Sequence, residues 1–68
     1  MFYVRALYDY QPGLPEEFGF REGDIIAVTH TDEDGWWDGE HTDPQRRAQE
    51  QANGSETFPS NFVVMTKD

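Results

Sequence analysis

The first half of the chain shows apolar patterns that predict three short strands. Residues 2–7 alternate, with Val4 and Ala6 on one side, and a period of two is typical of a half-buried strand. Residues 25–29 are rich in β-branched side chains, which favour strands. Residues 36–40 follow a polar, glycine-containing turn and form a third predicted strand.

Residues 8–24 are predicted to form a long loop that ends in a turn. Two prolines and a glycine between positions 12 and 15 exclude a regular helix or strand there. Phe18 and Phe20 lie two positions apart and are therefore expected to point the same way, back into the core.

The segment 41–56 differs from the predicted strands on either side of it. Asp43 can cap a helix and Pro44 suits the first helical position. Residues 45–52 are mostly good helix formers, but they carry almost no apolar stripe, and helices this short are marginal in water. The sequence is therefore compatible with either a short helix or a long loop.

Strands resume at residues 57–58 and 62–65, with a tight turn between them. Several short strands joined by turns predict an all-β fold, either a small barrel or a sandwich. A chain of 68 residues is long enough for one domain. The predicted core consists of Val4, Ala6, Phe18, Phe20, Ile26, Val28, Phe58 and Val63.

Composition and charge narrow the functional classes. The chain has fourteen Asp and Glu against five Lys and Arg, for a net charge of −9, and residues 1–40 hold ten of the acids and two of the bases. Such a surface repels phosphate, which disfavours nucleic acid and anionic membranes and favours a basic partner. The absence of cysteine excludes disulfides, thiolate zinc sites and a cysteine nucleophile.

The sequence lacks the features of a catalytic or metal site. His30 and His41 are the only histidines, and His30 precedes an acidic turn rather than a serine or cysteine partner. Their spacing matches no familiar metal-ligand pattern, and there is no glycine-rich phosphate cradle. We therefore expect no enzyme activity, no cofactor and no metal.

Five motifs occur in order along the chain: Ala6-Leu7-Tyr8-Asp9-Tyr10, Glu17-Phe18-Gly19-Phe20, Glu22-Gly23-Asp24-Ile25-Ile26, Gly35-Trp36-Trp37-Asp38-Gly39 and Phe58-Pro59-Ser60-Asn61-Phe62-Val63. Together they resemble the Src homology 3 (SH3) domain family, over residues 4–64 except 41–56. The resemblance implies a five-stranded barrel of two packed antiparallel sheets, with a 3-10 turn near residues 60–62. It also implies a non-catalytic module that binds proline-rich peptides in the polyproline II form.

The resemblance also implies which residues form the peptide site. Rings would wall two proline pockets, and Trp36 would separate them from a third pocket. There, acids of the flanking loops, including those at positions 32–34, would face an Arg or Lys of the ligand. The implied peptide-binding residues are Tyr8, Tyr10, Glu16, Glu17, Asp34, Trp36, Pro59, Asn61 and Phe62. Adjacent strand residues point to opposite faces, so Trp37 is expected to pack against neighbouring strands.

The chain departs from the family pattern at two places. Twenty-one residues separate Trp37 from Pro59, roughly twice the usual number, which places an insertion at about 41–56 in the distal hairpin. It is interpreted either as a harmless extension, since loop-closure entropy grows slowly with length, or as a second contact surface through Arg46 and Arg47. Phe62 replaces the usual Tyr, as in family members that bind ubiquitin, so a folded partner such as ubiquitin is an alternative ligand.

The resemblance also sets expectations for cellular context. Modules of this family usually lie inside longer signalling or cytoskeletal scaffold and adaptor proteins. We therefore expect a monomeric domain of a larger protein, without membrane insertion, in the cytoplasm or at the cell cortex and cytoskeleton.

Overall fold

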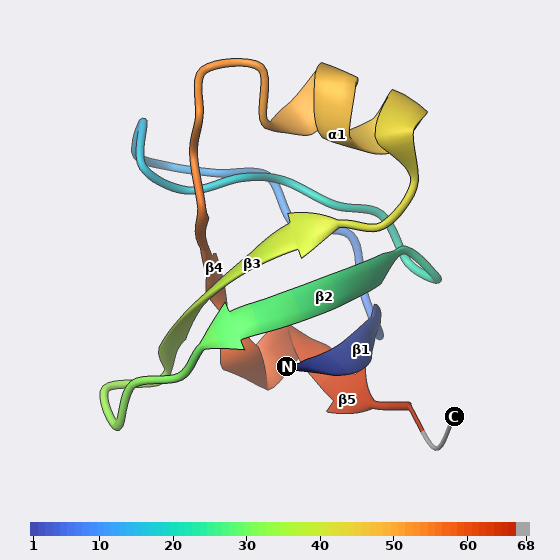
Figure 1. The fold of residues 1–68 in the computed structure, drawn as a ribbon. Helices are drawn as coiled ribbons and strands as arrows, with labels where there is room; N and C mark the ends of the chain where they lie inside the picture. Colours follow the sequence, from blue (N-terminus) through green and yellow to red (C-terminus); the bar gives the residue numbers. More distant parts are fainter. Residues whose placement is uncertain (67–68) are drawn as a thin grey trace.

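The computed structural model describes residues 1–66, which form five strands, one α-helix and one 3-10 turn. Figure 1 shows how these elements are arranged. In chain order the elements are β1 (Phe2–Ala6), β2 (Ile25–His30), β3 (Trp36–His41), α1 (Pro44–Glu50), β4 (Thr57–Pro59), η1 (Ser60–Phe62) and β5 (Val63–Met65). The strands pair antiparallel in one continuous, curled sheet of order β4-β3-β2-β1-β5. The predicted all-β, five-stranded barrel with a 3-10 turn is thus confirmed.

Three connections matter for the site. The β1–β2 loop (residues 7–24) is long and is drawn together by an antiparallel bridge between Tyr10 and Phe20. The β2–β3 loop (residues 31–35) is short and acidic. The β3–β4 connection (residues 42–56) contains α1.

The core lies on the inner face of the curled sheet and is closed by two phenylalanines of the β1–β2 loop. The fully buried apolar residues are Val4, Ala6, Phe18, Phe20, Ile26, Val28 and Phe58. Phe18 and Phe58 rings lie 5.4 Å apart, and large rings bury much area in a small domain. The predicted core is therefore confirmed, with Val63 packed against it and only partly buried.

Alternation along β3 decides which of its side chains face inward. Trp36 is exposed, whereas Trp37 packs edge-on against Phe2 and Phe58, as predicted. The same period of two brings Gly39 and His41 inward, and His41 is only 1% exposed. A methyl group on Gly39 would lie 2.7 Å from the carbonyl oxygen of Ala27, so glycine allows β2 and β3 to approach here.

The β3–β4 connection forms a short helix, one of the two structures that the sequence left open. Asp43 caps α1 by accepting a hydrogen bond from the Gln45 N–H at 2.9 Å, and Pro44 occupies the first turn. No residue of α1 is fully buried, so hydrophobic packing does not explain its stability.

Polar contacts hold α1 in place instead. The side chain of Gln51 accepts a hydrogen bond from the His41 N–H and donates to the carbonyls of Gly39 and Ser55. Arg46 pairs with Asp24 at 3.0 Å, and Arg47 pairs with Glu40 on β3 at 3.2 Å. Both guanidinium groups are engaged within the domain, which weakens the interpretation of Arg46 and Arg47 as a basic contact surface.

No helix among residues 1–66 is both long and apolar enough to cross a membrane.

Candidate functional site

The sheet topology gathers the aromatic residues singled out in the sequence. Tyr8 and Tyr10 lie in the β1–β2 loop, directly after β1, and Phe62 ends η1, directly before β5. Because β1 and β5 are paired, with Ala6 opposite Val63, these three rings come together. Phe62 meets Tyr8 edge-on at 5.9 Å and Tyr10 at 5.1 Å.

A second group forms where β3 pairs with β4. Trp36 lies opposite Pro59 in the register of this pair, and Asn61 follows in η1. Together with residues 34, 35 and 60 they line a pocket of about 400 Å³. Trp36 is 38% exposed, which leaves a flat apolar surface available beside this pocket.

The backbone around Trp36 is fixed from two sides. Its N–H donates to Oδ1 of Asp34 at 2.9 Å. The preceding Gly35 has a φ of +88°, a conformation that glycine adopts without strain, and its carbonyl accepts hydrogen bonds from both the N–H and the hydroxyl of Ser60. The Trp36 ring is thus presented from a rigid base.

Three hydrogen-bond donors in these two groups remain free. The Tyr8 hydroxyl, the Trp36 indole N–H and the Asn61 amide donate to no other group within residues 1–66. Tyr8 is 58% exposed and Asn61 is exposed. The surface therefore combines apolar rings with donors that can reach the carbonyls of a bound chain.

Tyr10 differs from Tyr8 because its hydroxyl is already engaged. It donates to Oε1 of Glu17 at 2.5 Å, and the same oxygen accepts the Gly13 N–H at 3.1 Å. Burial, followed by the bond to Glu17 and the charge of that carboxylate, raises the pKa of Tyr10 to about 12. The pair ties the two arms of the β1–β2 loop together across its tip.

The predicted acidic residues fall into two classes. Glu16, in the β1–β2 loop, and Asp34, in the β2–β3 loop, are exposed. Glu17 is only 8% exposed, and its Oε1 accepts the hydrogen bonds from both the Tyr10 hydroxyl and the Gly13 N–H. Its Oε2 accepts no hydrogen bond from residues 1–66 and is not fully buried. Glu17 is therefore part of the loop framework, with one oxygen left over.

The site residues thus lie in the β1–β2 loop, at the end of the β2–β3 loop with the start of β3, and in β4 and η1. Sequence analysis did not foresee every partner. Ser60, which anchors Gly35, was missed, and its signal is weak because a serine in a turn has many uses. Asp9 accepts a hydrogen bond from the Glu22 N–H at 2.8 Å, which ties the beginning of the β1–β2 loop to its end. The binding roles of the nine predicted site residues stay predictions.

Comparisons with known proteins agree with this architecture. The family model described as "SH3 domain" matches residues 5–47. Cell division control protein 15 of Schizosaccharomyces pombe is 49% identical over 63 residues, which cover 90% of this chain and 6% of that protein. Septation protein imp2 of the same organism is 51% identical over 63 residues, covering 90% of this chain and 8% of that protein.

A solved structure gives the same result at the level of the fold. The C-terminal SH3 domain of myosin IB from Entamoeba histolytica, bound to an EhFP10(GEF) peptide, superposes with a TM-score of 0.74 and 36% identity. The match covers 100% of this chain and 86% of that one. The chain spans less than a tenth of the length of the two fission-yeast relatives.

Proposed function

This chain belongs to the SH3 domain family, a family of protein-interaction modules, and on that premise we propose that it binds proline-rich peptides carrying an Arg or Lys. The ligand would adopt the polyproline II form, which has three residues per turn and no internal hydrogen bonds. Because this form exists before binding, docking costs little conformational entropy.

The combination of exposed rings with free donors is the observation that carries this proposal. A polyproline II chain presents apolar ridges and unpaired carbonyls. The rings of Tyr8, Phe62 and Trp36 would form the walls of a groove that receives these ridges. The free Tyr8 hydroxyl, Trp36 indole N–H and Asn61 amide offer donors for the carbonyls. A shallow surface of this kind favours micromolar affinity.

The acidic loops support the preference for a basic residue in the ligand. The β2–β3 loop carries three consecutive acids at positions 32–34, all exposed. In the β1–β2 loop, Glu16 is exposed and Glu17 retains the free Oε2. Of these, Glu16 and the acids of the β2–β3 loop are the better candidates for direct contact, since Glu17 is nearly buried.

Replacing Trp36 by Ala tests the groove directly. We expect Trp36→Ala to weaken binding of a basic PxxP peptide at least about tenfold, because a buried aromatic anchor typically contributes 2 kcal/mol or more to an interface. Isothermal titration calorimetry measures the affinity and circular dichroism checks the fold. Tyr3→Ala is a matched control, since Tyr3 is 43% exposed on β1 and outside the predicted groove. A folded Trp36→Ala variant with unchanged affinity would contradict the assignment.

A folded partner such as ubiquitin is the second candidate, and Phe62 is the observation that favours it. Phe62 has no hydroxyl and packs between Tyr8 and Tyr10, which makes this end of the groove more apolar. An NMR titration with ubiquitin is expected to shift the amides around Phe62, and Phe62→Tyr is expected to reduce those shifts. Ubiquitin shifts elsewhere, or none, would leave the proline-rich ligand as the only candidate.

We further propose that residues 1–68 form one non-catalytic binding domain of a longer scaffold protein in the cytoplasm, near the cytoskeleton. The support is the small share of each relative that the chain spans. The relatives' names refer to cell division and septation, and the structural neighbour belongs to a myosin.

A further inference from the structure

The β3–β4 connection presents one polar face to the β1–β2 loop. Arg46 and Glu50 lie four residues apart, the spacing that places side chains on one face of a helix, and the exposed Asn53 follows in the turn after α1. Arg46 and Glu50 are half-buried, whereas the helix residues between them are exposed. The half-buried face is the one that contacts the loop.

The contacts of this face run along the returning arm of the loop in order. Arg46 bonds to Oδ2 of Asp24 through Nη2 at 3.0 Å and Nε at 3.1 Å. Asn53 donates from Nδ2 to the carbonyl of Pro15, near the tip of the loop, at 3.2 Å. Both ends of the loop arm are therefore held by the β3–β4 connection, one by α1 and the other by the turn that follows it.

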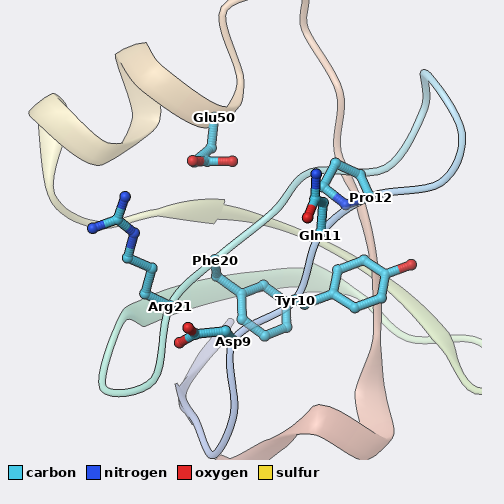
Figure 2. A pocket seen from close by; sticks show the side chains of 7 residues that line it. All are labelled: Asp9, Tyr10, Gln11, Pro12, Phe20, Arg21 and Glu50. Carbon is cyan, nitrogen blue, oxygen red and sulfur yellow. The ribbon is translucent and has the colours of Figure 1, made fainter.

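The middle of the arm is held at Gly19. A methyl group on Gly19 would lie 2.7 Å from Oε1 of Glu50 and 2.8 Å from the carbonyl oxygen of Tyr10, so only glycine allows this approach. The Gly19 carbonyl accepts a hydrogen bond from Nε2 of the buried His41 at 2.9 Å. Figure 2 shows Glu50 reaching from α1 toward the loop that carries Tyr10 and Pro12.

The same loop carries four of the nine predicted site residues. Tyr8, Tyr10, Glu16 and Glu17 all belong to it. Just beyond Asn53, the N–H groups of residues 56 and 57 both donate to the Glu16 carbonyl, at 3.2 and 3.1 Å. The position of these acids is thus tied to the β3–β4 connection through backbone and side-chain bonds.

We propose that the β3–β4 connection is a brace that holds the β1–β2 loop in its ligand-binding shape. Asn53 is then a positioning residue for recognition of the ligand's basic side chain, although it does not touch the ligand. A loop that is already ordered loses less entropy when it binds, so the brace raises affinity for ligands that use the acids of this loop. This inference rests on the proposed function for its affinity readout.

Asn53→Asp separates the brace from other effects. It removes the donor to Pro15 but keeps the oxygen that accepts the Ser55 N–H. It also adds a negative charge, which by itself would strengthen attraction to a basic ligand. Gln45→Ala is the matched control, because Gln45 is exposed in the same β3–β4 connection and its side chain bonds to nothing within residues 1–66.

The experiment compares two peptides on the parent and both variants: a PxxP peptide with Arg, and the same peptide with neutral citrulline in its place. We expect Asn53→Asp to lose about threefold or more in affinity for the Arg peptide, as for one lost hydrogen bond, and to change little for the citrulline peptide. A smaller folded fraction would weaken binding of both peptides equally, so the ratio of the two affinities reports how the loop is positioned. An unchanged ratio would overturn the proposal.

Amide hydrogen exchange gives a second readout that needs no ligand. We expect faster exchange in Asn53→Asp at the Gly13 and Glu17 amides of the loop, with Gln45→Ala like the parent. If the parent binds neither peptide, the proposed function fails, and the exchange data still decide the brace. Unchanged exchange at the loop amides would refute it.

Discussion

Tyr10 shows how a residue implied for ligand contact can also serve the framework of the domain. Its hydroxyl donates to Glu17, and its ring stacks on Phe20 at 5.5 Å. The sequence motif predicts a ring at this position, but it does not say where the hydroxyl points. The burial of Glu17 was equally hidden, because an acid among exposed loop residues gives no sign of a partner seven positions away.

The raised pKa of Tyr10, caused first by burial and then by the bond to Glu17, predicts a loss of stability at high pH. The pKa of Tyr10 is about 12 in the folded protein and 10.0 in an unperturbed tyrosine. The folded state therefore holds this proton more tightly, and its contribution is full below pH 10.0 and lost as the pH rises toward 12. The loss is on the order of 2 kcal/mol. Urea unfolding at several alkaline pH values measures it.

Two variants isolate the effect. Tyr10→Phe is expected to be less stable than the parent at neutral pH and to lose less of its stability between pH 10.0 and 12. Tyr8→Phe removes another hydroxyl while keeping the bond to Glu17, so it should follow the parent. If the stability of Tyr10→Phe and that of the parent fall in parallel as the pH rises, titration of the Tyr10 hydroxyl is not the cause of the alkaline loss.

At the scale of elements, the strands were predictable from the sequence, whereas the helix was one of two structures that the sequence left open. Strands β1, β2 and β5 carry alternating or β-branched residues, while β3 was predicted from the polar turn before it and β4 from the tight turn after it. Helix α1 has no buried face, and its stability depends on Asp24, which lies 22 residues before Arg46. Local propensity cannot reveal such a partner. The brace was invisible for the same reason.

The Arg46–Asp24 pair predicts a loss of stability in acid. Burial alone would raise the pKa of Asp24, but the hydrogen bond from the Arg21 N–H and the Arg46 guanidinium outweigh it, with a smaller effect of His41, and the pKa is lowered below 3.8. The pair thus stabilises the fold above pH 3.8, and this contribution is lost as the pH falls through the lowered pKa. Thermal unfolding between neutral pH and pH 2 measures it.

Neighbouring arginines provide the comparison. Arg46→Gln is expected to flatten the acid limb of the stability curve and to cost roughly 1 kcal/mol at neutral pH. Arg47→Gln removes a more exposed pair with Glu40, 47% and 54% exposed, and such surface pairs contribute little. If both variants behave alike, the Asp24 contact has no special weight.

At the scale of the whole molecule, the negative charge is concentrated in two loops beside the proposed peptide groove. The β1–β2 loop carries five carboxylates and one arginine, and the β2–β3 loop carries three carboxylates. The one adjacent pair of basic residues in the sequence, Arg46 and Arg47, is engaged by carboxylates of the domain itself. The sequence predicted this concentration in residues 1–40, and the two loops precede and follow β2 (Figure 1).

This arrangement predicts a binding affinity that depends on salt and on the charge of the ligand. Between about 0.1 M and 1 M salt the Debye length falls from about 10 Å to about 3 Å, which screens attraction from loop acids that do not touch the ligand. We expect the affinity for the Arg peptide to fall severalfold over this range. The citrulline peptide should bind more weakly at low salt and change little, because it keeps the apolar contacts. Calorimetric titrations across the salt series measure both, and equal salt dependence of the two peptides would show that the acidic loops do not contribute to recognition.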